Sequence, residues 1–227
     1  MKLVILPLLF ITLFSSTRAD SWLPPTARVF SSPNGKFLLH ILPKALKSFP
    51  ELPEDAAGNS KERKTLGLNE TCQATLFQKD NEKGIDSATI RFHPVWQQKL
   101  VNEVAPMDAY VSDDGRFVVT TDDYGFLGDG ENVVVIYSEG KFIRRYKLTE
   151  FIPQSAIDTL QVPQSTSSIE WAGRHRIDSK NGLLLLQVWK SGNPFNLPVK
   201  TPAQYRTVTI RLSTGEILQD PKPKVNR

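Results

Sequence analysis

Cysteine is nearly absent from this chain, because Cys72 is the only one among 227 residues. A single cysteine excludes an intramolecular disulfide and any metal site built from several thiolates. A chain of this length does not need disulfides, since its hydrophobic core can hold the fold. Cys72 lies in the apolar stretch 71–77, where a buried, inert thiol is expected rather than a nucleophile.

The motifs of several common enzyme classes are also missing. The sequence contains no Gly-x-Ser-x-Gly elbow, no His-Glu-x-x-His zinc site and no Gly-x-x-x-x-Gly-Lys phosphate loop. Gly128 and Gly130 begin a dinucleotide-binding fingerprint, but Val133 stands where the third glycine belongs. The three histidines are spread along the chain, at His40, His93 and His175. The sequence therefore predicts no catalytic residue, no cofactor, no cofactor-binding residue and no metal ligand.

Long apolar runs are absent except at the N-terminus. Met1-Lys2 precede an apolar stretch at residues 3–14, and small residues follow at Thr17 and Ala19. This order of basic, apolar and small residues is typical of a cleavable signal peptide. The stretch is shorter than the roughly 20 residues that a spanning helix needs. We therefore expect cleavage of residues 1–19 between Ala19 and Asp20, which gives a secreted or periplasmic protein without a transmembrane segment.

The charge balance gives little indication of a partner. The formal net charge is +4, and Lys2 and Arg18 of the predicted signal peptide contribute two of the basic residues. The dense basic segments elsewhere, 61–64 and 222–227, have the composition of a solvated linker and a terminus. No nucleic-acid partner is predicted. The partner is left unknown, and a protein or an envelope component is the class that fits export.

Three segments share a turn that is followed by apolar residues. They begin at Ser32-Pro33-Asn34-Gly35, Ser112-Asp113-Asp114-Gly115 and Ser179-Lys180-Asn181-Gly182. Asn-Gly and Asp-Gly pairs adopt the positive φ values that tight hairpins require. Each turn is therefore predicted to join two neighbouring antiparallel strands. After the second turn, Thr120 is predicted to be an exposed strand position.

A second hairpin follows two of these turns. Residues 135–143 and 210–218 each contain a strand, a glycine turn and another strand. The corresponding hairpin after the first turn is placed at 74–79 and 87–92. The sequence thus predicts an all-β, antiparallel fold of about three four-stranded units, in one domain at residues 20–227.

Two stretches depart from the strand pattern. Residues 43–69 are rich in Pro, Lys, Glu and Ser, and are predicted to form a surface insertion. Residues 148–160 form the only convincing helical stretch, with short helical segments on both sides of Pro153 and with Ser155 as the expected N-cap.

The turn at 32–36 and the segment Ser213-Thr214-Gly215-Glu216-Ile217 resemble blade turns of β-propellers, as in WD-repeat proteins and the periplasmic propellers of the Tol system. No Trp-Asp pair ends a unit, so the WD-repeat family itself is not indicated. Closed propellers typically have four to eight blades, more than the three units predicted here. The resemblance implies an open or incomplete propeller, or units that associate between chains. A β-sandwich is the alternative.

Acidic residues and glycines gather in the segment 121–132. Its carboxylates are Asp122, Asp123, Asp129 and Glu131. Several oxygen ligands on a flexible loop would suit calcium, although the spacing does not match an EF-hand. Asp and Gly are also ordinary turn residues between strands, and that interpretation is favoured. Whether the Asp122–Glu131 loop binds calcium stays open.

The leading hypothesis for function is an exported, non-enzymatic β-sheet module that binds or scaffolds through loops and sheet edges. It follows from the missing catalytic motifs. The alternative is an extracellular hydrolase with acids in the Asp122–Glu131 loop and a histidine such as His175 brought near by folding. A hydrolase needs its acid and base within hydrogen-bond reach in one pocket. Tryptophans could form a ligand platform, but core positions are favoured for Trp22, Trp96, Trp171 and Trp189.

Overall fold

A computed structural model describes residues 25–44, 70–80, 91–165, 168–190 and 204–219 of the chain. The predicted signal peptide and most of the predicted insertion at 43–69 lie outside these residues. Within the described ranges, no helix is long and apolar enough to cross a membrane.

Consecutive strands pair into three antiparallel sheets of four strands each. Sheet 1 contains β1 (Arg28–Ser31), β2 (Phe37–Leu42), β3 (Gln73–Lys79) and β4 (Phe92–Lys99). Sheet 2 contains β5 (Pro106–Val111), β6 (Phe117–Asp123), β7 (Val134–Ser138) and β8 (Lys141–Tyr146). Sheet 3 contains β9 (Arg176–Asp178), β10 (Leu183–Trp189), β11 (Tyr205–Arg211) and β12 (Glu216–Gln219). The predicted all-β fold of three four-stranded units is confirmed.

The three predicted Asx-Gly turns each join the first two strands of a sheet, as expected. Their glycines all have positive φ, between 63° and 69°. The first two turns also have the same internal hydrogen-bond pattern. The Ser112 hydroxyl donates to the Asp114 carboxylate at 2.6 Å and accepts from the Phe117 N–H at 2.9 Å. Ser32 makes the same contacts with Asn34 and Phe37.

The third hairpin is offset by one residue from the other two. In sheet 2, Val111 pairs with Val118, so Asp114-Gly115 lies at the centre of the hairpin. In sheet 3, Asp178 pairs with Leu183, so the centre lies one residue earlier than the corresponding Asn-Gly pair. Neighbouring residues of a strand point to opposite faces, and a shift of one residue therefore exchanges the two faces.

This offset decides which face of sheet 3 is buried. Phe117 and Val119 of β6 pack in the cluster that faces the following sheet. Their counterparts by sequence are Leu184 and Leu186, which would point away from sheet 2 if the hairpins were equivalent. Because of the offset, they pack back against sheet 2 in the same cluster. Sheet 3 thus buries its apolar face against sheet 2.

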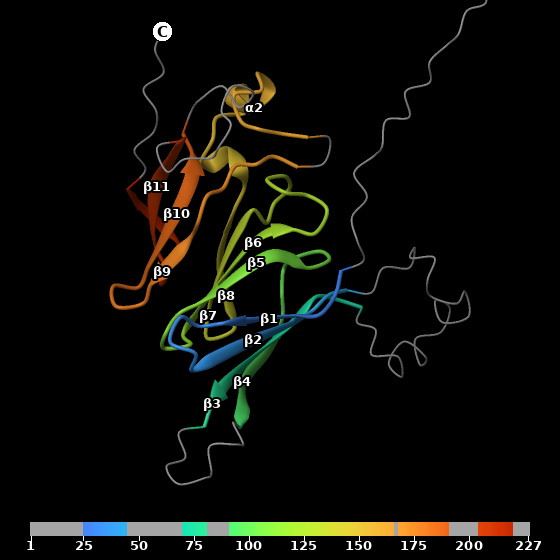
Figure 1. Cartoon of the computed structure of the whole chain (residues 1–227), viewed down its shortest axis with the longest axis vertical. Coiled ribbons are helices and arrows are strands. Elements are labelled where there is room, and N and C mark those ends of the chain that lie inside the picture. The colour runs from blue at the N-terminus through green and yellow to red at the C-terminus, as the bar shows by residue number, and fades with distance from the viewer. Residues whose placement is uncertain (1–24, 45–69, 81–90, 166–167, 191–203, 220–227) are drawn as a thin grey trace, which may run out of the picture.

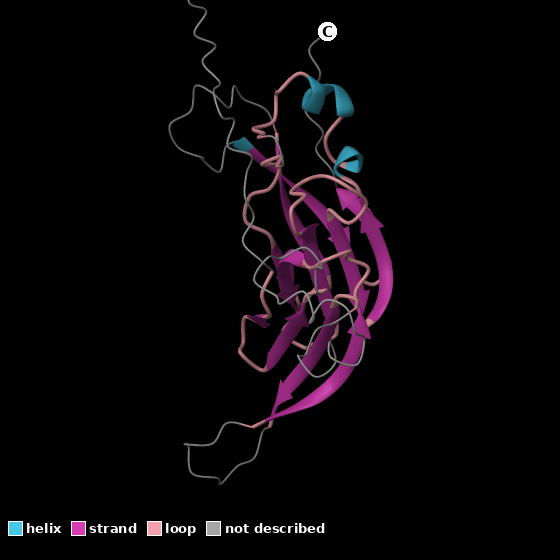
Figure 2. Ribbon diagram, turned by 90° about the vertical axis from the view of Figure 1, so that its right-hand side faces the viewer, coloured by secondary structure: helices cyan, strands magenta, loops and turns pink. Residues whose placement is uncertain are grey.

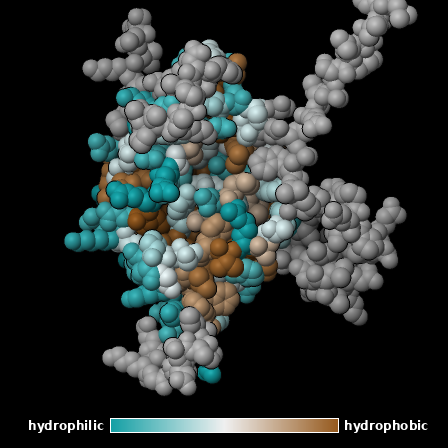
Figure 3. Space-filling model, viewed as in Figure 1, coloured by the Kyte–Doolittle hydropathy of each residue, from teal (hydrophilic) through white to brown (hydrophobic). Residues whose placement is uncertain are grey.

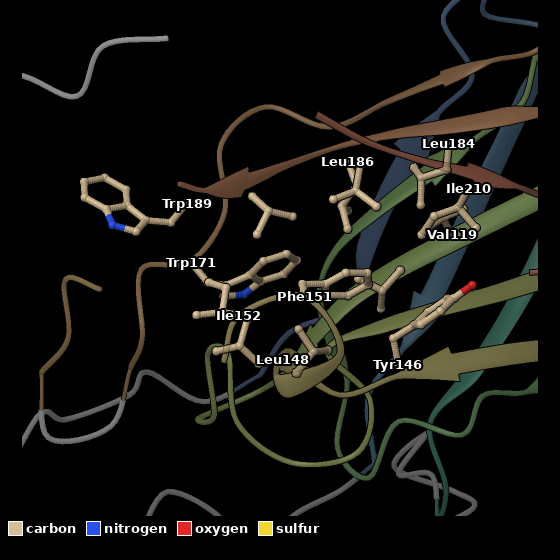
Figure 4. Close-up of a cluster of buried hydrophobic side chains, with 14 of the residues drawn as sticks. Val119, Tyr146, Leu148, Phe151, Ile152, Trp171, Leu184, Leu186, Trp189 and Ile210 are labelled. Atoms are coloured by element: carbon tan, nitrogen blue, oxygen red, sulfur yellow. The ribbon is translucent and has the colours of Figure 1, made fainter. Parts of the chain in front are cut away.

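The sheets follow one another so that sheet 2 lies in the middle (Figure 1). One buried cluster joins sheets 1 and 2 and contains Leu39, Leu76 and Val135. A second joins sheets 2 and 3 and includes Trp171 and the helical segment after β8. Figure 4 shows this second cluster, with Phe151 and Trp171 between the strands of sheet 3 and that helical segment. Burying each such large side chain contributes about 1.5–3 kcal/mol, so the two clusters hold the three sheets together.

The middle position of sheet 2 makes one prediction wrong. Thr120 is fully buried rather than exposed, and its hydroxyl donates to the Asn102 side-chain oxygen at 3.2 Å. All seven residues of β6 are buried, because sheets cover both of its faces. A strand in a sheet covered on both faces has no solvent side, so its polar residues need internal partners.

The second hairpin of sheet 1 also differs from its prediction. β3 begins at Gln73, close to the predicted 74, but its partner β4 spans 92–99 rather than 87–92. Residues 87–90 lie outside the described residues. Pro94 made the later segment a poor strand candidate, since proline lacks the N–H of the ladder. β4 is an edge strand, where that missing donor is tolerated.

The predicted stretch is helical and lies at one end of the sheets, where Figure 2 shows helical turns. It consists of a 3-10 turn, η2 (Leu148–Glu150), and one short helix, α2 (Gln154–Asp158). The N-cap of α2 is Pro153, and the predicted N-cap Ser155 lies inside the helix. Proline fits a helix start because its φ is preset and the N–H it lacks would be unpaired there.

Candidate functional site

The acidic segment follows β6 and lies between sheets 2 and 3. Its first two carboxylates, Asp122 and Asp123, belong to the buried end of β6. The other two, Asp129 and Glu131, lie on the exposed part of the loop. The four carboxylates therefore occupy two different environments.

Asp122 is the centre of the buried part. One carboxylate oxygen accepts the Gly128 N–H at 2.7 Å and the Trp171 indole N–H at 3.0 Å. The residue has a φ of 54° and only 6% of its surface is exposed. Burial raises its pKa to about 6, although both hydrogen bonds favour the charged form. Asp122 thus ties the loop after β6 to the core tryptophan of the next unit.

Gly128 is required for this arrangement. A Cβ atom at Gly128 would lie 2.8 Å from the Trp171 ring and 2.9 Å from Ile169, and the residue has a φ of 72°. Both the close approach and the backbone conformation favour glycine. Close packing therefore explains Gly128, whereas Gly125 and Gly130 are explained by their positive φ of 83° and 82°, since nothing lies within 4 Å of an added Cβ there.

Asp123 bonds to the loop between β4 and β5. Its carboxylate accepts the Glu103 N–H at 2.9 Å, and the Asn132 amide donates to the same oxygen at 3.2 Å. On the exposed side, Asp129 accepts the Gly130 N–H at 2.7 Å. Glu131 pairs with Lys147 at 2.5 Å, and this hydrogen-bonded ammonium holds the pKa of Glu131 below its ordinary value.

The calcium interpretation finds little support in these contacts. The four carboxylates point to different partners, three of them to backbone N–H groups. Among the described residues, no three His, Cys, Asp or Glu side chains gather into a group that could hold a metal ion. The contacts instead support the interpretation of the segment as structured turns.

His175 does lie close to the acidic segment, as the hydrolase hypothesis requires. Its ring stacks on Trp171 at 5.4 Å between centroids, and it meets the Tyr110 ring edge-on at 5.8 Å between centroids. Its Nδ1 accepts the Gln187 N–H at 3.1 Å. Only 5% of the residue is exposed, and burial lowers its pKa to about 4. The imidazole is therefore neutral at pH 7, with its proton on Nε2.

Trp171 separates the acid from the histidine. The indole bonds to Asp122 through its N–H and stacks on His175 with its face. In the described part of the chain, Asp122 and His175 share no hydrogen bond. Because both are buried around a tryptophan that is 1% exposed, the trio has the geometry of a core polar cluster rather than an open acid–base pocket.

The other histidines and the cysteine lie elsewhere. His40 is a half-buried residue of β2 that pairs with Val29 and Thr75. His93 lies on β4, where its Nδ1 is 2.6 Å from Asp80. Cys72 is buried, and burial raises the pKa of its thiol to about 12, which agrees with the expected inert thiol.

The tryptophans occupy the core, as favoured. Trp171 and Trp189 belong to the cluster between sheets 2 and 3, and Trp96 packs against the other cluster. Trp22 lies outside the described residues. The described tryptophans therefore form no shared exposed platform.

One concave site was not predicted from sequence. A cavity of about 390 Å³ lies between the loop after β6 and the helical segment after β8. Gly128, Asp129, Glu131 and Lys147 contribute polar lining, and the apolar lining comes from Leu148, Ile157 and Ile169. These residues come from four separate stretches of chain with no common motif, so no sequence pattern indicates the cavity.

Comparison with protein-family models and with curated protein sequences finds no match to the chain.

Proposed function

We propose that this chain is an exported, non-enzymatic module that binds or scaffolds a partner, with three propeller-like units in an open array. The observation that carries the proposal is the structural role of Asp122 and His175 in the core. The hydrolase alternative depends on acids of the Asp122–Glu131 loop and on a histidine such as His175. Asp122 is the acid of this loop that bonds to the tryptophan on which His175 stacks, and both residues serve buried structural contacts. Asp122 is 6% and His175 5% exposed, so neither side chain is open to a substrate, which would have to come within hydrogen-bond reach of it.

The surface offers contact sites for a partner. Figure 3 shows apolar residues, in brown, gathered over the region where Figure 1 draws β1 and β2. Val29 of β1 is 60% exposed, and Phe126 of the acidic loop is 55% exposed. Exposed aromatic and aliphatic side chains are common anchors in protein–protein interfaces. They support a protein partner more than a small substrate.

The proposal predicts a discrete cross-link at the acidic loop. A photo-reactive amino acid at Phe126 is expected to give one adduct in the envelope or medium of the producing cells. The same residue placed at Thr207, an exposed position of β11, is the control and is expected to give none. The adducts are detected by gel shift and mass spectrometry. The intact mass of the recovered protein is expected to match a chain that begins at Asp20.

Two results would contradict the proposal. One is the absence of an adduct at Phe126 above the level at Thr207. The other is hydrolysis of an ester, peptide or glycoside substrate that is lost in a folded Asp122→Asn variant, which would favour the hydrolase.

A further inference from the structure

One face of sheet 1 packs against sheet 2, and in the described part of the chain no other sheet covers the opposite face (Figure 1). Neighbouring residues of a strand point to opposite faces. Leu39 and Leu76 are buried against sheet 2, so their neighbours Leu38 and Phe77, which pair with each other, lie on the opposite face. We call this the free face of sheet 1.

The centre of the free face is apolar. Val29, which pairs with His40 on this face, is 60% exposed. Leu38, Leu42 and Phe77 are only half-buried. Figure 3 shows apolar residues gathered over the region where Figure 1 draws β1 and β2. A contiguous exposed apolar patch typically marks an interaction site.

The ends of the free face are basic. Lys36 precedes the buried Phe37 and stands opposite Lys79, whose N–H donates to the Lys36 carbonyl at 2.8 Å. Both lysines are exposed, and so is Lys99 at the other end of the face, where it pairs with Gln73. The four strands of sheet 1 contain no Asp or Glu.

The opposed pair Lys36 and Lys79 is a cost that the fold does not offset. Like charges directly opposite each other on a sheet are destabilising. Among the residues that the structure describes, no carboxylate forms an ion pair with Lys36, Lys79 or Lys99. An acidic partner would neutralise these ends of the face.

We infer that the free face of sheet 1 docks a partner protein through an apolar surface with acidic side chains at both of its ends. Gln73 and Lys79 mark the two ends of β3, so the acidic groups lie about 20 Å apart at roughly 3.4 Å per residue. The apolar centre is covered by the partner, and the acidic groups pair with the lysines. This inference rests on the proposed binding function and adds the surface and the chemistry of the partner.

Two other occupants fit the free face less well. A second copy docked through the same face would bring lysines against lysines with no acid on either side. An anionic membrane would neutralise the lysines, but insertion requires apolar side chains that reach about 5–10 Å into the bilayer. Leu38, Leu42 and Phe77 are half-buried in the pleated face. A flat sheet face instead suits another protein surface, as sheet 2 shows on the other side.

The test uses the whole protein and a synthetic helical peptide of about 14 residues, a length that spans about 20 Å. The peptide has a leucine stripe, glutamates in its first and last turns, and a lactam bridge on its outer side. A control peptide carries lysines in place of the glutamates. Titration followed by NMR is expected to shift the amides of Leu38, His40 and Phe77, with a dissociation constant on the order of 100 μM for the glutamate peptide. The lysine peptide is expected to bind at least about tenfold more weakly.

Reversing one lysine separates binding from folding. Lys79→Glu is expected to weaken the glutamate peptide roughly tenfold, because it reverses a charge that the peptide contacts. The same variant is expected to raise Tm by about 1–3 °C, because an opposite-charge pair with Lys36 replaces the like-charge pair. Lys190→Glu reverses an exposed lysine at the end of β10 in sheet 3 and is the control, with an expected change in affinity of less than about twofold.

A third variant tests the apolar centre. Val29→Asp places a carboxylate there at an exposed position of the edge strand β1, and it is expected to weaken the glutamate peptide roughly tenfold.

Four results would overturn the inference. Two are equal binding of the two peptides and an unchanged affinity in Lys79→Glu. The third is a dimer in sedimentation equilibrium that Val29→Asp dissociates, which would assign the free face to a second copy. The fourth is cosedimentation with vesicles of phosphatidylcholine and phosphatidylserine that Lys79→Glu abolishes, which would assign it to a membrane. The adduct expected at Phe126 is measured independently, so a failed docking face and a failed binding function are distinguished.

Discussion

Replacing Gly115 by valine is expected to lower the free energy of unfolding by about 3 kcal/mol or more. Gly115 has a φ of 69°, a region that costs a β-branched residue heavily. The added side chain would also collide with the preceding unit, because a Cβ at Gly115 would lie 2.4 Å from the ring of Phe37 in sheet 1. Phe37 is itself buried, so its ring has little room to move. Urea denaturation measures the effect.

Gly35 provides the matched control for this prediction. It occupies the same place in the first turn with a φ of 67°, but nothing lies within 4 Å of an added Cβ. Gly35→Val is therefore expected to cost only the backbone strain, about 1–2 kcal/mol. Thr207→Val at an exposed strand position should be close to neutral. Equal losses for Gly115→Val and Gly35→Val would mean that the two turns do not pack as described.

Asp122 and His175 are expected to give the protein two opposing dependences on pH. The folded-state pKa of Asp122 is raised to about 6, so its contribution to stability is present at low pH and is lost as pH rises through 6. The folded-state pKa of His175 is lowered to about 4, so stability is lost as pH falls from 6.5 towards 4. Between pH 7 and pH 4 each effect amounts to about 2–3 kcal/mol, with opposite sign.

Single variants should uncover each effect. Relative to the parent, Asp122→Asn is expected to become less stable by about 2 kcal/mol more at pH 4 than at pH 7, because the histidine is then unopposed. His175→Gln is expected to shift the other way by about 3 kcal/mol, because no buried imidazole is left to be protonated as the pH falls. Unfolding free energies at both pH values measure these differences. Parallel pH curves for the parent and both variants would contradict the burial of the two groups.

The turns are the part of the fold that was predictable from sequence. Asn34-Gly35 and Asp114-Gly115 encode positive φ locally, and a local requirement of this kind can be recognised without knowledge of the rest of the chain. The count of three four-stranded units followed from these turns. The helical segments around Pro153 followed in the same way from local residue preferences.

The relation between units was not predictable from the turn motif. The offset of the third hairpin moves Leu184 to the opposite face, and the shared Asn-Gly pair conceals it. The burial of Thr120 depends on a second covering sheet, which a single strand pattern does not reveal. The exposure of Thr120 was inferred from an isolated strand, whereas burial is decided by neighbours distant in sequence.

The candidate site was predictable only in part. The acidic segment was recognised, and the sequence raised the possibility that His175 comes near it. The role of Trp171 was missed, because its hydrogen bond to Asp122 joins residues 49 positions apart. Only the folded arrangement shows that the tryptophan lies between the acid and the histidine.

A double-mutant cycle between Asp122 and Trp171 tests most directly whether this cluster is structural. Trp171→Phe keeps a stacking ring and removes the indole donor, and Asp122→Ala removes the acceptor. The unfolding free energies of the parent, the two single variants and the double variant should give a coupling of about 1.5–3 kcal/mol, the scale of a hydrogen bond to a charged group. A coupling near zero, together with a hydrolytic activity that requires Asp122, would show that the residue serves catalysis rather than the fold.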